Sequence, residues 1–143
     1  MARLKINIPE KMLASFIIPL RITDINYGNH VGNNAFVEII HEARMQFLNQ
    51  NGLAELNPSG TSLIMSELLV EYKKEAFYKD ELTVSVFSGE ISRAGFELFY
   101  LISAMRDNQR IIIAHAKTGM VCYNYQTKKV QAITEELRSI LSS

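Results

Sequence analysis

One long amphipathic helix, placed directly after a single strand, constrains the fold of this chain more than any other feature. Residues 34–49 form the predicted helix, because their apolar side chains recur at helical spacing. The apolar flank consists of Phe36, Ile39, Ile40, Ala43 and Phe47. Asn33 is the expected N-cap, and Asn51-Gly52 is expected to end the helix in a left-handed cap. One long helix must therefore cover whatever sheet the rest of the chain forms.

The remaining segments are predominantly extended, with turn-forming residues between them. One strand is expected before the helix and four after it: Ser15–Thr23, Leu63–Ala76, Leu82–Ile91, Phe96–Arg106 and Ile111–Tyr125. A short closing helix is expected over Thr134–Leu141, where Thr134 and the following glutamates give a capping arrangement. The sequence predicts an α+β fold, with an antiparallel sheet of about five strands wrapped around one long central helix. A single domain over residues 1–143 accounts for the whole chain.

Two strand segments are more apolar than a single covering helix explains. Ile111–Ile113 and Val84–Phe87 would be buried by a partner as readily as by the helix. Long strands with too few covering layers favour a sheet that continues into a second copy of the chain. We therefore expect a homodimer or a homotetramer.

Composition excludes several classes of protein. Fifteen basic residues balance fifteen acidic residues, so bulk charge gives no reason to expect a nucleic-acid partner. Cys122 is the only cysteine, and the three histidines lack ligand spacing, so we expect no disulfide and no metal site. No apolar stretch approaches the ~20 residues that span a bilayer. We expect no membrane partner and a cytoplasmic protein.

Polar residues concentrate in the loop before the long helix, between Thr23 and Asn34. Turn formation alone can explain such a loop. His30, however, places a titratable imidazole just ahead of the helix and six residues after Asp24. The amides at a helix N-terminus can polarise a carbonyl group, and a neighbouring carboxylate or histidine can activate water. The loop is therefore the candidate reaction centre.

The segment RITDINYGNHVGNNAFVEIIHEAR resembles the signature of the hot-dog thioesterases of the 4-hydroxybenzoyl-CoA thioesterase type. Residues that match it in register are Arg21, Asp24, His30, Val31, Asn33, Glu38, Ala43 and Arg44. The later segment EYKKEAFYKDELTV resembles the second conserved stretch of that family. The resemblance implies a hot-dog fold and hydrolysis of an acyl-CoA or acyl-carrier thioester to the free acid and thiol. It implies no cofactor, because coenzyme A is part of the substrate.

The match departs from the family pattern at one position. Asn26 stands where many members carry a catalytic aspartate, and asparagine cannot act as a nucleophile or a base. Asp24, two residues earlier, is one remaining candidate for the base. Other branches of the superfamily place the acid on the helix, and by that resemblance Glu38 is the second candidate, although it shares the polar side of the helix with Glu42. His30 and Asn26 are expected to orient water or the thioester carbonyl. The catalytic candidates are Asp24, Asn26, His30 and Glu38.

Substrate binding is assigned to a second set of residues. The backbone amides at Asn33 and Asn34 would hold the thioester carbonyl, with Tyr27 beside them. Lys73 and Arg93 are candidate partners for the phosphates of coenzyme A, although charged residues near strand ends are often only solvated. Two other functions stay open on the same fold: a dehydratase that acts on 3-hydroxyacyl thioesters, and an acyl-CoA-binding module without catalysis.

Overall fold

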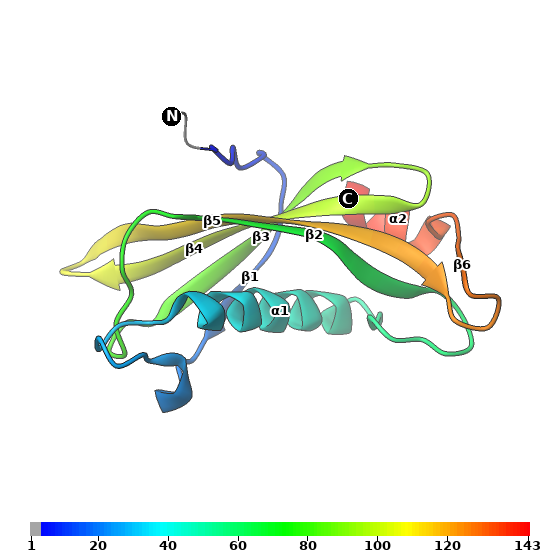
Figure 1. Ribbon diagram of the computed structural model, residues 1–143. Coiled ribbons are helices and arrows are strands. Elements are labelled where there is room, and N and C mark those ends of the chain that lie inside the picture. Colours follow the sequence, from blue (N-terminus) through cyan, green and yellow to red (C-terminus); the bar gives the residue numbers. More distant parts are fainter. Residues whose placement is uncertain (1–3) are drawn as a thin grey trace.

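The computed structural model describes residues 4–143 as one sheet with a long helix against it (Figure 1). The strands are β1 (Met12–Ile18), β2 (Ser62–Tyr72), β3 (Leu82–Ile91), β4 (Gly95–Arg106), β5 (Gln109–Asn124) and the short β6 (Lys129–Val130). The helices are the 3-10 turn η1 (Ile22–Asp24), α1 (Asn33–Gln50) and α2 (Glu135–Ser142). The predicted α+β hot-dog architecture is confirmed.

The sheet is antiparallel, and its strand order is β1-β3-β4-β5-β2, with β6 paired to β5. The strand that follows α1 therefore lies at the opposite edge from the strand that precedes it. Helix α1 runs along one face of this sheet (Figure 1). The β4–β5 hairpin at the centre closes through Asp107 and Asn108, which have φ of 50° and 62°. Two left-handed residues form the turn that suits a two-residue hairpin.

The predicted apolar flank of α1 forms the middle of the core. Its five apolar residues are at most 3% exposed, and they pack with inward-facing side chains of β3, β4 and β5 such as Val84, Leu98 and Ala116. The helix ends at Gln50, with Asn51 as its C-cap residue, and Gly52 adopts a φ of 72°. This left-handed conformation favours glycine, so the predicted end of the helix is confirmed.

Several predicted boundaries were wrong. Strand β1 begins at Met12 rather than Ser15 and ends at Ile18 rather than Thr23. It ends there because Pro19 has no N–H for the ladder, and Thr23 lies in η1. Helix α1 begins at Asn33; Gly32 is the N-cap residue, and no side chain caps this end. Strand β2 stops at Tyr72 instead of Ala76. The amides of the next two residues both bind the carbonyl of Ile113, which breaks the ladder.

The closing helix has the expected cap. The hydroxyl of Thr134 accepts a hydrogen bond from the amide of Leu137 at 3.2 Å. Leu137 and Leu141 are buried in the core, so α2 is anchored by its apolar side. Across residues 4–143, no helix is both long enough and apolar enough to span a membrane.

Candidate active site

The loop before α1 folds into a narrow hairpin. Ile25 and Val31 form an isolated antiparallel bridge, and the amide of Asn26 donates to the carbonyl of His30 at 2.9 Å. Asn29 sits at the tip with a φ of 66°, a conformation that asparagine tolerates better than most residues. The amide of Val31 binds the carbonyl of Ala76 at 2.7 Å, which ties the hairpin to the segment after β2.

The side chain of Asn26 holds the turn of this hairpin. Its Oδ1 accepts a hydrogen bond from the amide of Gly28 at 2.8 Å, the geometry of an Asx turn. Because only the oxygen is used, an aspartate could make the same contact. Asn26 therefore has a turn-forming role of its own, and its Nδ2 nitrogen makes no hydrogen bond within residues 4–143.

Asp24 is buried, and both of its carboxylate oxygens are engaged. Oδ2 accepts from the backbone amide of Arg21 at 2.8 Å, and Oδ1 accepts from the guanidinium of the same residue at 3.2 Å. The hydrogen bond and the charge of Asp24 raise the pKa of Arg21 above its usual value. Asp24 thus caps η1 and fixes the position of Arg21.

A hollow of about 320 Å³ lies between this loop and the start of α1. It is lined by Thr23, Asp24, Ile25, Asn26, Gly32, Asn33, Asn34, Ala35 and Glu38. Five of the sequence candidates therefore meet at one place. Among the described residues, the amides of Asn33 and Asn34 have no hydrogen-bond acceptor. These amides and the helix dipole leave the hollow with a positive electrostatic potential at its helix end.

Glu38 is the accessible carboxylate of the hollow. Its side chain is 68% exposed, against 3% for Asp24, and its Oε2 lies 3.7 Å from the guanidinium of Arg21. A second hollow of about 440 Å³ continues along the same side of α1, where Arg21 and Glu42 join the lining. Glu38 therefore lies where the two hollows meet and can exchange protons with solvent.

His30 and Tyr27 lie outside the lining of this hollow. The His30 Nε2 atom is 3.7 Å from the carboxylate of Glu75, and its side chain is one-third exposed. Tyr27 is fully exposed at the turn of the hairpin. Both residues belong to the outer side of the loop, where they can contact a substrate only beyond the hollow.

The two candidate phosphate partners lie at opposite ends of the sheet. Lys73 follows Tyr72, whose hydroxyl donates to the carbonyl of Asn33 at 3.2 Å, so it lies near the start of α1. Lys73 also pairs with Glu71 at 3.5 Å. Arg93 lies in the turn after β3, the strand whose ten residues extend roughly 30 Å from the end nearest the loop. Within one chain, Arg93 is not brought to the hollow.

Tyr72 is a residue of this region that the sequence did not reveal. Its hydroxyl binds Asn33, and its ring packs edge-to-face against that of Phe36, with the ring centroids 5.4 Å apart. Burial raises the pKa of Tyr72, so its hydroxyl stays a neutral donor. The alternation of strand β2 predicts which face its side chain occupies, but not that it meets the first turn of α1.

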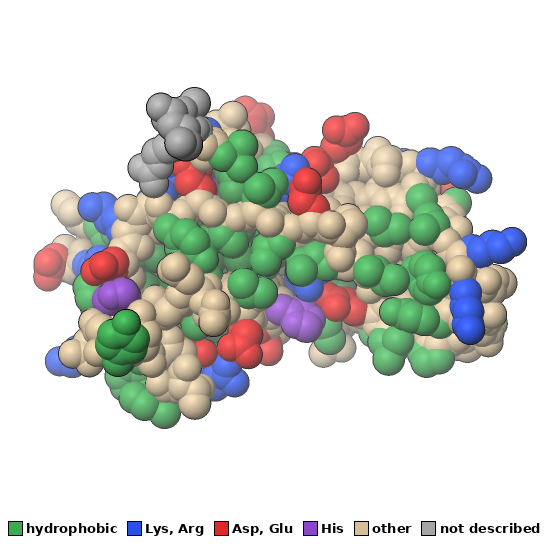
Figure 2. All heavy atoms as spheres, viewed as in Figure 1, with side chains coloured by type: hydrophobic (Ala, Val, Ile, Leu, Met, Phe, Trp, Pro, Cys, Tyr) green, Lys and Arg blue, Asp and Glu red, His purple; other side chains and the backbone are tan. Residues whose placement is uncertain are grey.

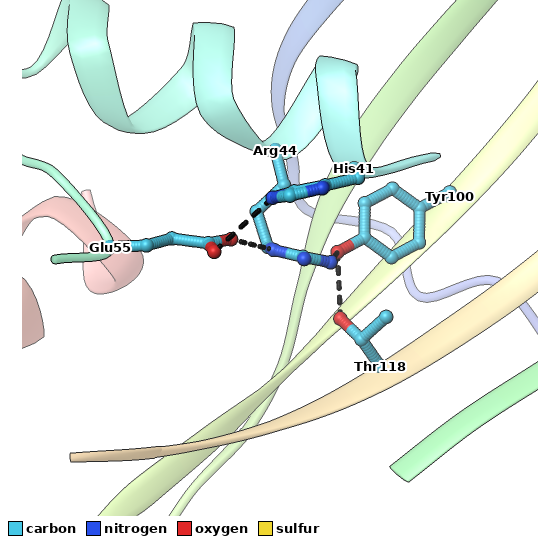
Figure 3. A network of polar contacts seen from close by, with 5 residues as sticks. All are labelled: His41, Arg44, Glu55, Tyr100 and Thr118. Atoms are coloured by element: carbon cyan, nitrogen blue, oxygen red, sulfur yellow. Dashed lines mark hydrogen bonds and ion pairs between the residues drawn. The ribbon is translucent and has the colours of Figure 1, made fainter. Parts of the chain in front are cut away.

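A polar network that is buried at Arg44, Tyr100 and Thr118 lies farther along α1 (Figure 3). The Nε of Arg44 donates to Glu55 at 2.5 Å, and its Nη1 donates to the hydroxyl of Tyr100 at 3.4 Å. Tyr100 in turn lies 2.6 Å from Thr118 Oγ1, and His41 Nε2 lies 3.3 Å from Glu55. Burial is the main cause that raises the pKa of Tyr100. The network ties helix, loop and sheet together.

This network borders a groove of about 250 Å³ between α1 and β2. The groove is lined by Val37, Ile40, His41, Arg44, Glu55, Met65 and Leu68. Figure 2 shows hydrophobic side chains gathered on this face, along β2 and the adjoining flank of α1. Val37 and Met65 remain about 40% exposed. The groove is therefore mostly apolar, with polar groups at one end.

A larger hollow, about 660 Å³, lies on the opposite face of the sheet. Its carboxylates Glu67 and Glu97 both bind the ammonium of Lys117, at 3.0 and 3.2 Å. No residue of the loop or of α1 lines it. Size alone therefore does not identify the reaction centre, and the smaller hollow at the start of α1 has the suitable groups.

The family model of the thioesterase-like superfamily matches residues 20–141. A curated relative, the long-chain acyl-CoA thioesterase FadM of Escherichia coli (strain K12), is 24% identical over 125 residues. That alignment covers 87% of this chain and 93% of the relative.

Solved structures of low sequence identity have the same fold. A 1,4-dihydroxy-2-naphthoyl-CoA thioesterase from Synechocystis has a TM-score of 0.80 at 20% identity, and the match covers 90% of this chain and 95% of the other. A Staphylococcus aureus protein determined in complex with CoA also has a TM-score of 0.80, at 16% identity. That match covers 96% of this chain and 86% of the other.

Proposed function

Because the chain belongs to the thioesterase-like superfamily, we propose that its hollow at the start of α1 is where it hydrolyses an acyl-CoA thioester. Thioester hydrolysis is the activity of this enzyme. The observation that supports the location is the meeting of Glu38, Asn26 and the free amides of Asn33 and Asn34 around one hollow. A carboxylate, an amide and an oxyanion-binding helix end are the groups that this reaction needs.

In the proposed mechanism, the thioester carbonyl oxygen accepts hydrogen bonds from the amides of Asn33 and Asn34. Glu38 takes a proton from water as the water oxygen attacks the carbonyl carbon. The carbon–sulfur bond of the tetrahedral intermediate then breaks, and the proton passes from Glu38 to the leaving thiolate. The products are the free acid and coenzyme A. This chemistry consumes water alone, so we propose that no cofactor takes part.

Asn26 and Asp24 support these groups. The unused Nδ2 of Asn26 is a donor that can orient the water or the carbonyl oxygen. Asp24 is a poorer candidate for the base, because it is buried and both of its oxygens already bind Arg21. It acts as a positioning residue that holds Arg21 within 3.7 Å of Glu38.

The coenzyme A portion is proposed to lie on the outer side of the loop. His30, Tyr27 and Lys73 surround that side, and a cationic Lys73 suits a phosphate. Arg93 is too far away within its own chain. Arg93 can contribute to a binding site only if a second copy of the chain places its own Arg93 beside the loop of the first.

Edge strand β2 is the proposed contact with that second copy. It is eleven residues long, and among the described residues its strand partner is β5 alone. On its other edge the amide of Leu63 binds the carbonyl of Glu55 at 2.7 Å, and the backbone groups beyond it have no strand partner there. The exposed Met65 and Val37 lie beside this edge. A second β2 strand would satisfy the remaining backbone groups and lie against the exposed Met65, which favours a homodimer as the minimal unit.

A thiol-release assay tests the function. Wild-type protein is incubated with short, long and aromatic acyl-CoAs and a thiol-trapping dye, beside the Glu38→Gln variant. We expect thiol release by the wild type well above that by the variant. Equal rates for both proteins across the whole panel would contradict the proposal. Gain of α,β-enoyl thioester absorbance without release of thiol, on a 3-hydroxyacyl-CoA, would indicate the dehydratase instead.

A further inference from the structure

Arg44 is the arginine that lines the groove between α1 and β2, beside His41. The apolar part of the groove is formed by Val37, Ile40, Met65 and Leu68. Arg44 itself is only 5% exposed. A guanidinium at the end of an apolar groove costs desolvation unless all of its donors are paired.

The guanidinium has five N–H donors, and two of its three nitrogens are used by the protein. Nε binds Glu55, and Nη1 binds the hydroxyl of Tyr100. Within residues 4–143, Nη2 has no acceptor. No fully sealed side-chain nitrogen or oxygen of the described residues lacks a partner. Nη2 is therefore reached from outside, and the groove is the opening that Arg44 lines.

The charge of this site selects the kind of acceptor that fits. Glu55 neutralises the guanidinium at 2.5 Å, and it also binds His41. A second carboxylate in the groove would face the negative charge of Glu55. An uncharged oxygen, such as a hydroxyl or a ketone, would accept from Nη2 without that repulsion.

The groove lies at a suitable distance from the proposed reaction centre. Glu38 lines the hollow and Arg44 lines the groove, six residues farther along the same helix. At 1.5 Å per residue this separation is about 9 Å along the helix axis, and at 3.6 residues per turn the two side chains point about 120° apart around it. An acyl group of medium length, with its carbonyl at the hollow, therefore has to pass over the exposed side of α1, beside Val37 and His41, to reach Arg44.

We propose that Arg44 is a specificity-determining residue that binds an uncharged oxygen near the far end of the acyl group. The inference rests on the proposed function and names its substrate class: acyl-CoAs of medium length with a distal hydroxyl or keto group. A purely hydrocarbon chain of the same length leaves Nη2 without a partner, and sites built around a hydrogen bond reject such analogues strongly.

Matched substrate pairs test the proposal on the wild-type enzyme. Each acyl-CoA is compared with its ω-hydroxy derivative of the same chain length. The long pairs use hexanoyl-, octanoyl- and decanoyl-CoA, and butyryl-CoA with 4-hydroxybutyryl-CoA is the short pair. We expect kcat/KM to be roughly tenfold higher for the hydroxylated member at the length that reaches Arg44, as for a buried donor that gains its partner. The butyryl pair should show no such difference.

Variants identify the residue responsible. Arg44→Met combined with Glu55→Gln removes both charges together, so no unpaired carboxylate remains, and it should abolish the preference. Leu68→Phe fills the groove and should lower kcat/KM for the long chains more than for butyryl-CoA. Lys117→Met removes a cation from the opposite face of the sheet and should leave the preference intact.

The outcomes separate this inference from the proposed function. If no acyl-CoA is hydrolysed, the proposed function fails. If acyl-CoAs are hydrolysed but no pair differs at any length, only the role of Arg44 is refuted. A preference that survives in the Arg44/Glu55 double variant also refutes it. If Leu68→Phe changes the oligomeric mass and not the chain selectivity, a second copy fills the groove, and the inference is wrong.

Discussion

Oε2 of Glu38 lies 3.7 Å from Nη2 of Arg21, and the same guanidinium nitrogen lies 3.2 Å from the buried carboxylate of Asp24. One arginine is thus shared between two carboxylates of different exposure. Asp24 also binds the backbone amide of Arg21, whereas Glu38 makes only the longer contact. The buried carboxylate is held in place, and the exposed one stays free to accept a proton.

We predict that Glu38→Gln lowers kcat by about 10²-fold or more, the usual contribution of a general base. The melting temperature should change little, because the side chain is largely exposed. Glu42→Gln is the matched control, since Glu42 lies one helical turn farther along and is absent from the lining of the hollow. A loss of activity in the control as large as in Glu38→Gln would show that bulk charge is responsible.

A carboxylate at position 26 should partly replace Glu38. Asn26→Asp keeps the oxygen that accepts from Gly28, so the hairpin should fold normally. In the Glu38→Gln background, we expect Asn26→Asp to raise kcat roughly tenfold above that of Glu38→Gln alone, since both positions line one hollow. Asn26→Ala in the same background is the comparison, and it should restore nothing.

Asp24→Asn should act mainly on stability. The substitution weakens two hydrogen bonds from Arg21 to a buried carboxylate, and we expect a loss of roughly 1–3 kcal/mol in the free energy of unfolding. Chemical denaturation measures this loss, and Arg21→Ala should show a similar effect. If Asp24→Asn abolishes hydrolysis in a protein of wild-type stability, Asp24 is the base and Glu38 is not.

Asp80 should make stability depend on pH in the acid range. Its hydrogen bonds from Arg106, aided by the amide of Phe77, hold its pKa below the ordinary value of 3.8. A folded-state pKa that is depressed stabilises the protein above the unfolded value, and the contribution disappears as the pH falls through the folded value. The free energy of unfolding of Asp80→Asn should therefore be lower than that of the wild type at pH 7. The difference between the two free energies should shrink below about pH 4. A constant difference across that range would contradict this account.

Met65→Lys should weaken the homodimer. Met65 is 41% exposed on edge strand β2, and a lysine there places a charge against the partner. Met12→Lys is the control, because Met12 is exposed at the other edge of the sheet, in β1. Light scattering on the eluting protein measures the mass of each variant. A monomeric wild type, or dissociation only in Met12→Lys, would rule out β2 as the contact.

The parts of the fold that depend on local pattern were predictable. The burial of Phe47 follows from helical spacing, and the left-handed Gly52 from its place after the helix. The end of β1 was missed, because apolar residues continue past Pro19 and hide the break in the ladder. Local pattern identifies elements better than it identifies their ends.

The candidate site was predictable only where it is contiguous in sequence. Asn26, Asn33 and Glu38 lie within one loop and one turn of helix, and the structure brings them together. Contacts across the fold were not accessible: Arg44 meets Glu55 from a connecting loop and Tyr100 from β4. Arg93 was assigned without knowledge of which end of the sheet it would occupy.

The two-residue turn at Asp107 and Asn108 has a consequence for the order of folding. It joins β4 and β5 with almost no loop to close. By contrast, the hydroxyl of Ser66 in β2 binds the carbonyl of Gly119 in β5 across 53 residues of chain, and Ser15 of β1 pairs with Ser85 of β3 across 70. Local pairings form before distant ones, because closing a long loop costs entropy first. The central hairpin should therefore acquire amide-exchange protection earliest, and both edges of the sheet should be completed late. A newly made chain would then present its β2 edge to a partner only after its own core is sealed, which limits mispairing while it folds.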